Sequence, residues 1–159
     1  MPEWNDFYVA AAGGSAALAG LVFVGISINL KNILSIKGLD MRASISLFLL
    51  LGILIISLLL LVPVVNNTGG IFVLISGSIV WLAITIFDIK IYRGKPPYYK
   101  KIYLINMVLN QVATLPYIIA GCIILAGYED GFYFIVPAFV FSTIKAVLDA
   151  WVLLVEINR

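Results

Sequence analysis

The stretch that decides the fold is ASISLFLLLGILIISLLLLV, residues 43–62, which contains no charged side chain. A helix needs about 20 mostly apolar residues to cross the hydrocarbon core of a bilayer. This segment has that length and is followed by Pro63, which cannot continue a helix. It therefore predicts a membrane-spanning helix rather than the core helix of a soluble domain.

Four further segments share this composition, so we expect five spans in a single all-α domain, a transmembrane helix bundle. The hydrophobic fraction is 63% and the charged fraction 11%, whereas soluble domains are close to half apolar and about a quarter charged. A soluble chain of 159 residues would not bury this much apolar surface, so we expect it to lie in a lipid bilayer. The predicted spans are residues 7–30, 43–62, 70–91, 102–126 and 132–155.

Basic residues concentrate in two of the four predicted connectors, and the other two contain none. Cytoplasmic loops of membrane proteins carry an excess of Lys and Arg. The distribution therefore predicts an N-terminus outside the cell and a C-terminus in the cytoplasm. The basic residues are Lys31, Lys37 and Arg42 in the first of these connectors, Lys90, Arg93, Lys95, Lys100 and Lys101 in the second, and Arg159 at the C-terminal end.

The residue types also argue against several kinds of chemistry. The chain has no histidine and a single cysteine, Cys122. Histidine-based metal or haem sites, histidine acid–base catalysis and an internal disulfide are therefore excluded. No phosphate-binding glycine loop and no metal-ligand spacing occurs, and we expect no cofactor, no metal and no enzymatic activity, although a Ser–Lys dyad stays open. The basic residues fall in short connectors, which argues against nucleic-acid binding.

The N-terminal segment WNDFY (4–8), followed by AAAGGSAALAGLVFV (10–24) and SINL (27–30), resembles a family of small uncharacterised prokaryotic membrane proteins. The resemblance covers about the first fifth of the chain. It implies a multi-pass protein of a prokaryotic cell membrane. It implies no activity and transfers no site residue.

Small residues recur on one face of the first predicted span. Ala12, Ala16 and Gly20 repeat every four positions. Small side chains let helix backbones approach closely, which is how helices associate in lipid. Two interpretations stay open: packing inside one subunit, and contact with a second copy or another membrane subunit.

The fifth predicted span carries two charges near its middle. Asp149 follows Lys145 by four residues, so both lie on one helical face. Charges at that depth cost roughly 3 kcal/mol each and usually face a protein interior or a water-filled cavity. A structural ion pair and an ion or proton site both fit this pattern.

The fourth predicted span carries a polar stripe of Asn106, Asn110 and Thr114, with Gln111 beside it. The turn between the last two spans is short, and we expect its centre between Glu129 and Asp130. Residues equidistant from this turn should lie at equal depth. That rule places Lys145 level with Thr114, and Asp149 level with Asn110.

These stripes predict a polar cluster that opens toward the cytoplasm. The candidate transport site consists of Asn110, Thr114, Lys145 and Asp149, surrounded by Asn106, Gln111 and Asp88.

The sequence thus favours a small channel or transporter. We expect it to assemble as a homo-oligomer, because five spans leave little room for a pore within one subunit. The alternative is an accessory or regulatory subunit that acts through helix–helix contacts with a membrane partner. A cluster continuous with water favours transport, and an isolated cluster whose charges satisfy one another favours the accessory subunit.

Overall fold

The computed structural model describes residues 4–36, 38–63, 68–94, 96, 98 and 100–157, except for the side chains of residues 129, 156 and 157. All regular elements in this part of the chain are helices. Five are long and apolar enough to cross a membrane, which confirms the predicted number of such segments and the all-α class. The elements are α1 (Asn5–Ile28), α2 (Leu30–Ser35), α3 (Leu39–Leu61), α4 (Thr68–Arg93), α5 (Lys100–Leu125), the 3₁₀ helix η3 (Glu129–Phe134) and α6 (Ile135–Ile157).

The start of α3 differs from the predicted boundary in a way that matters for function. Gly38 has a φ of 91°, a left-handed conformation that glycine adopts at no steric cost. The chain turns there and enters α3 at Leu39, before the predicted start at residue 43. Arg42, which the charge pattern assigned to a connector, therefore lies inside the helix.

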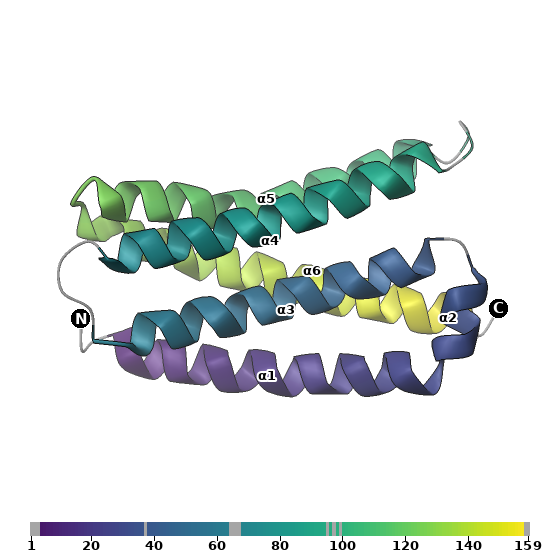
Figure 1. Cartoon of the computed structure of the whole chain (residues 1–159), viewed down its shortest axis with the longest axis horizontal. Coiled ribbons are helices and arrows are strands. Elements are labelled where there is room, and N and C mark those ends of the chain that lie inside the picture. Colours follow the sequence, from purple (N-terminus) through teal and green to yellow (C-terminus); the bar gives the residue numbers. More distant parts are fainter. Residues whose placement is uncertain are drawn as a thin grey trace.

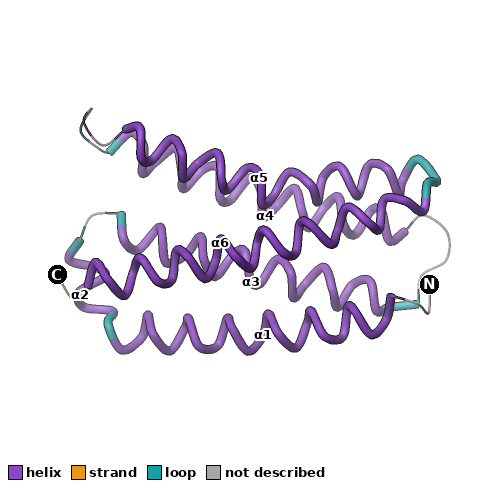
Figure 2. The backbone as a smooth tube through the Cα atoms, turned by 180° about the vertical axis from the view of Figure 1, so that it is seen from behind, coloured by secondary structure: helices purple, strands orange, loops and turns teal. Residues whose placement is uncertain are grey.

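The long helices run side by side along the long axis of the molecule (Figures 1 and 2). α3 contacts α1, α4 and α6, and α5 packs against both α4 and α6. α3, α4, α5 and α6 thus form a four-helix bundle, and α1 is attached to it mainly along α3. Only 17% of the apolar window of α1 is buried, against 44% for α3, so α1 is the peripheral helix.

The closest helix pair in the bundle is α4 with α5, and glycines make the approach possible. A Cβ atom at Gly77 would lie 2.6 Å from Cβ of Tyr117, and one at Gly121 would lie 2.8 Å from Cα of Leu74. Only a residue without a side chain fits at such distances. The tightest small-residue contact therefore joins α4 and α5 and does not involve α1.

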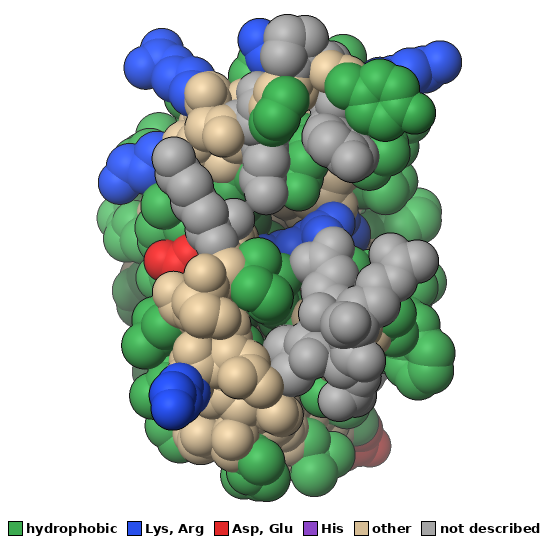
Figure 3. All heavy atoms as spheres, turned by 90° about the vertical axis from the view of Figure 1, so that its right-hand side faces the viewer, with side chains coloured by type: hydrophobic (Ala, Val, Ile, Leu, Met, Phe, Trp, Pro, Cys, Tyr) green, Lys and Arg blue, Asp and Glu red, His purple; other side chains and the backbone are tan. Residues whose placement is uncertain are grey.

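The two ends of the bundle have different surfaces. At the basic end, where α1 and α4 finish and α3 and α5 begin, Lys and Arg side chains lie mainly along the upper and left edges of the face shown in Figure 3. At the opposite end, here called the aromatic end, the ring of Trp4 lies 5.1 Å from that of Tyr133, and the ring of Phe7 stacks on that of Phe139 at 5.7 Å. The exposed basic residues at the basic end are Lys31, Lys90, Arg93 and Lys101; Lys37, Lys95 and Arg159 lie outside the described residues.

Candidate functional site: a charge cluster inside the bundle

Ionisable side chains from three helices meet in the half of the bundle nearer the basic end. Asp88 of α4 is 5% exposed, and Lys145 and Asp149 of α6 are 5% and 2% exposed. Arg42 of α3 reaches them with a side chain that is 14% exposed. Asn110 of α5 is fully buried beside them. We call these five residues the charge cluster; its formal charges are two positive and two negative.

Asp149 is the carboxylate that holds the cations of the cluster. Lys145 Nζ donates a hydrogen bond to Asp149 Oδ2, one turn away on the same helix. Arg42 Nε lies 3.7 Å from the other carboxylate oxygen, Oδ1. One carboxylate thus pairs with two cations, one from its own helix and one from α3.

Asp88 has a different kind of partner. Asn110 Nδ2 lies 2.9 Å from each of the two carboxylate oxygens of Asp88. Among the described residues no ion pair includes Asp88, and Lys145, Arg42 and Asp149 act on it electrostatically from a greater distance. The carboxylate of Asp88 is therefore buried against a neutral amide.

The register between α5 and α6 differs from the expected one by about one helical turn. Ser142 Oγ donates to the Ala113 carbonyl at 3.1 Å, and the Tyr117 hydroxyl lies 3.2 Å from the Ala138 carbonyl. Extended by one turn toward the basic end, these pairs place Lys145 level with Asn110 rather than with Thr114. The cause is the position of the turn.

That turn lies at Gly127 and Tyr128. The amide of Gly127 (φ 88°) donates to the Ile124 carbonyl at 3.0 Å, and the amide of Tyr128 donates to the Ile123 carbonyl at 3.2 Å. These bonds end α5 before Glu129. η3 already belongs to the returning segment, so the centre of the turn is earlier than the sequence indicated.

The other predicted site residues lie beside the charge cluster without joining its contacts. The Thr114 hydroxyl donates to the Asn110 carbonyl of its own helix at 2.8 Å. Gln111 accepts a hydrogen bond from the Trp81 indole and donates to Thr85 Oγ1 at 3.2 Å, a separate contact between α5 and α4. The side chain of Asn106 is half-buried and makes no hydrogen bond or ion pair with the described residues.

Arg42 is the member of the charge cluster that sequence reasoning missed. The sequence feature that could have identified it is Gly38, which lies one turn before Arg42. A helix that begins directly after this glycine includes Arg42, and the guanidinium is then buried. The charge pattern instead assigned Arg42 to a basic connector, which served to predict the orientation of the chain in the membrane.

The predicted small-residue face of α1 is divided between two surroundings. Ala12 is buried, together with Tyr8, Ser15 and Ala19 on the same side of the helix. Ala16 and Gly20 are exposed, and no atom lies within 4 Å of a Cβ placed at Gly20. The face therefore does not pack inside one subunit as a unit.

Apolar groups flank the charge cluster, and the buried group toward the basic end contains residues of α2, α3 and α6 only. Toward the aromatic end lies a buried group that includes Ile53, Val73 and Ile135. Toward the basic end lies a smaller one that includes Leu39, Ala43 and Leu153. Arg42 is the member of the charge cluster that is nearest the surface, and its side chain is 14% exposed.

The cluster offers limited means for other chemistry. No group of three or more His, Cys, Asp or Glu in the described part of the chain is placed to hold a metal ion. Lys145 donates to Asp149, and the hydroxyls of Ser46 and Ser142 donate to the carbonyls of Ala146 and Ala113. These bonds form no Ser–Lys dyad. The arrangement suits the binding of a proton or a small cation at a carboxylate.

No family model, curated protein or solved structure matches the chain. The resemblance of the N-terminal segment to small prokaryotic membrane proteins therefore stays a prediction.

Proposed function

We propose that the chain is a multi-span protein of the cell membrane, with its basic end in the cytoplasm. The five apolar helices supply the spans. Exposed Lys and Arg side chains at one end fit the positive-inside rule, and Trp4 and Tyr133 at the other fit the aromatic belt of a membrane interface. The N-terminus then lies outside and the C-terminus inside.

Within this membrane the protein moves a proton or a small cation, and Asp88 is the residue that binds it. The observation that carries this proposal is the pairing of the buried Asp88 carboxylate with the neutral amide of Asn110. An ionised carboxylate away from water is costly unless it is paired or neutralised. Asp149 has two cations for that purpose, whereas Asp88 has none in direct contact among the described residues. A bound proton or cation neutralises it.

Asn110 suits both states of such a site. An asparagine amide carries donors on one side and an acceptor on the other. Its Nδ2 donates to the ionised carboxylate, and after a flip of the amide its Oδ1 accepts from the protonated acid. Within the described residues that Oδ1 has no other hydrogen-bond partner. The amide of Asn110 can therefore satisfy the carboxylate in both its ionised and its protonated state.

Lys145, Asp149 and Arg42 have a different role in this proposal. They satisfy one another, which is the pattern expected of a structural group. The sequence pointed to a transport site of Asn110, Thr114, Lys145 and Asp149, with Asp88 beside it. Within that set, the contacts favour Asp88 and Asn110. Because Asp88 and Asn110 are buried, transport in this proposal requires a movement of helices that exposes them.

The test is ion flux into liposomes that contain the purified protein. Asp88→Asn keeps the shape and a hydrogen bond to Asn110 but removes the carboxylate, so we expect a folded protein without flux. The matched control is Asp40→Asn, which removes an exposed carboxylate near the basic end and should leave the flux unchanged. Wild-type flux in Asp88→Asn, or no wild-type flux under any proton or cation gradient, refutes the transport proposal.

An accessory membrane subunit is the second candidate, and one observation favours it. Gly13, Ala16, Ala17 and Gly20 form an exposed small-residue face on α1, on the side of the helix away from Ala12 and Ala19. A face of this kind lets a helix of another subunit approach closely. Absence of flux together with retained assembly supports this candidate.

A further inference from the structure

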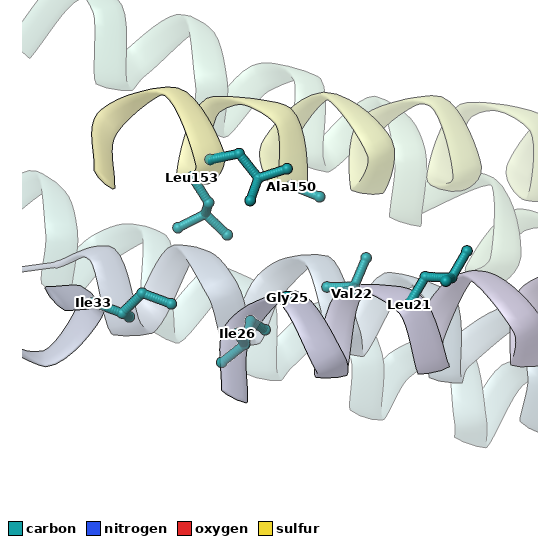
Figure 4. Close-up of a pocket in the computed structure, with 8 residues that line it drawn as sticks. Leu21, Val22, Gly25, Ile26, Ile33, Ala150 and Leu153 are labelled. Carbon is teal, nitrogen blue, oxygen red and sulfur yellow. The ribbon is translucent and has the colours of Figure 1, made fainter. Parts of the chain in front are cut away.

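Asp88 and Asn110 meet in the packed interior of the bundle and not at a cavity wall. Asp88 is 5% exposed and Asn110 is fully buried. Two cavities lie between α1 and α6, and no residue of the charge cluster lines either of them. The one shown in Figure 4 has apolar side chains such as Val22, Ile26 and Leu153 on its walls. The size of the ion that Asp88 can hold therefore depends on its own contact with Asn110.

The amide of Asn110 covers the side of Asp88 on which a metal ion would bind. Asn110 Nδ2 lies 2.9 Å from Oδ1 and 2.9 Å from Oδ2 of Asp88. An atom at equal distances from both oxygens occupies the place of a metal ion that a carboxylate binds in a bidentate manner. The amide nitrogen carries two hydrogens and only donates, so it is no metal ligand.

The separation of the two side chains leaves room for a proton between them and not for a metal ion. After a flip of the amide, Oδ1 of Asn110 takes the place of Nδ2 and faces the carboxylate. A hydroxyl and the oxygen that accepts its proton lie roughly 2.5–3.0 Å apart. A metal ion holds each oxygen at about 2.0–2.6 Å, so two oxygens on its opposite sides lie about 4–5 Å apart.

Close contacts between α4 and α5 fix this separation. Gly77 and Gly121 bring the two helices so near that an added Cβ atom would lie 2.6 Å and 2.8 Å from atoms of the facing helix. Gln111, the residue after Asn110, forms hydrogen bonds to two side chains of α4. Moving Asp88 away from Asn110 to admit a metal ion would break these contacts, so α4 and α5 act as one unit.

A metal ion beside the pair would lack ligands among the described residues. An ion such as Ca²⁺ takes about six to eight oxygens. The other carboxylate of the charge cluster, Asp149, is held by Lys145 and Arg42. No group of three or more His, Cys, Asp or Glu in the described part of the chain is placed to hold a metal ion. A protonated Asp88 needs one acceptor, and Asn110 Oδ1 is buried and has no other hydrogen-bond partner within that part.

The charges that act on Asp88 come from α3 and α6. Arg42 and Lys145 are cations and Asp149 is an anion, while Asn110 of α5 is neutral. The two cations favour the ionised form of Asp88, whereas burial and the charge of Asp149 favour the neutral acid. These effects oppose each other, which suits a site that both takes up and releases a proton.

We propose that Asp88 binds a proton and no metal cation. The proton adds to one carboxylate oxygen of Asp88, which then donates to Asn110 Oδ1, and no other bond forms or breaks. Water on one side of the membrane supplies the proton, and water on the other side accepts it. This proposal rests on Asp88 as the binding residue of the proposed function, and it narrows the species that this residue takes.

The first test follows the protonation of Asp88 and does not depend on transport. Infrared difference spectra of the purified protein, recorded over a range of pH, report the C=O stretch of protonated carboxyl groups. We expect a band that titrates in the wild type, is absent in Asp88→Asn, and persists in Asp40→Asn, which lacks an exposed carboxylate instead. Asp88→Ser is a second variant without the carboxyl group, for use where Asp88→Asn does not fold.

The midpoint of this titration separates a proton site from a metal site. We expect the same midpoint in the chlorides of choline, Na⁺, K⁺ and Mg²⁺ at equal ionic strength. A competing metal ion at about ten times its Kd would lower the midpoint by about one pH unit, because the ion and the proton would compete for the ionised carboxylate.

The second test is flux into liposomes, with a trapped pH-sensitive dye and, in parallel, uptake of radioactive Na⁺. We expect an inward proton gradient to acidify liposomes with the wild type faster than liposomes with Asp88→Asn. Uptake of Na⁺ should not exceed that of liposomes without protein.

The outcomes distinguish the two proposals. A midpoint that falls in a metal chloride, the absence of a titrating band that Asp88→Asn lacks, or Na⁺ uptake that Asp88→Asn abolishes overturns the binding of a proton alone. Na⁺ uptake of that kind leaves transport in place. A titrating band with an unchanged midpoint, together with no flux, refutes transport and supports proton binding.

Discussion

The sharing of Asp149 between two cations predicts that the two halves of the Lys145–Asp149 pair are not equivalent. Asp149→Leu removes the common partner and leaves the buried Lys145 ammonium without its hydrogen-bonded counter-ion. Breaking a buried pair in this way costs about 3–5 kcal/mol, or roughly a 150- to 5,000-fold shift of the unfolding equilibrium. Lys145→Met leaves Asp149 paired with Arg42, so its cost should stay near that of one hydrogen bond to a charged group, about 1.5–3 kcal/mol.

Equilibrium unfolding in mixed micelles, followed by circular dichroism, measures both losses. The double variant Lys145→Met with Asp149→Leu should recover part of the loss of Asp149→Leu, because Arg42 is then the remaining cation and its side chain, already 14% exposed, can reach the basic end. Ser142→Ala is a control for the loss of a buried polar contact on the same face of α6. Equal losses in the two single variants, or a larger loss in Lys145→Met, would refute the shared-carboxylate argument.

Three further predictions concern packing, orientation and assembly. Gly121→Ala should lower stability by about 1–3 kcal/mol, because its Cβ would lie 2.8 Å from Cα of Leu74; Gly13→Ala, with open space around it, should cost nothing in the same thermal unfolding assay. Single cysteines at positions 4, 98 and 130 in a Cys122→Ser background should react with an impermeant maleimide on intact cells at 4 and 130 but not at 98, and the opposite pattern reverses the orientation. Ala16→Leu should dissociate an oligomer, seen by light scattering, while the helices stay folded; an unchanged oligomer places the subunit contact elsewhere.

The spans were predictable because each is a long apolar run with few charges, a pattern that depends on local composition alone. The run at residues 43–62 is the clearest case. Its start was less predictable, because the charges of Asp40 and Arg42 break the apolar pattern, which therefore indicates a loop there. The left-handed conformation of Gly38 and the burial of Arg42 against Asp149 extend α3 by one turn, and both depend on the folded structure.

The candidate site was predictable as a set of residues and not as a set of partners. Spacing along α6 identified Lys145 with Asp149, which are in contact. Contacts between helices depend on register, and the register between α5 and α6 depends on where the chain turns. The positive φ of Gly127 places that turn earlier than the charged residues suggested, and one turn of error separates Thr114 from Asn110. The pairing of Asp88 with Asn110 also needs the close approach of α4 and α5, which no single-helix pattern reports.

In the proposed membrane location, the position of Lys145 and Asp149 on one face of α6 bears on how this helix would enter the bilayer during synthesis. α6 follows the other four spans along the chain, so it meets the lipid while its neighbours are already inserted. Two isolated charges at mid-depth would hinder partitioning from the translocation channel. Here each charge has its counter-ion one helical turn away, and the most apolar 18-residue window of Asp130–Val155 has a mean hydropathy of 1.9. α6 therefore enters as a nearly neutral rod, and Arg42 joins the pair only when the helix docks. The Lys145–Asp149 bond that stabilises the finished bundle would thus also lower the free-energy cost of inserting α6, before this helix contacts any other.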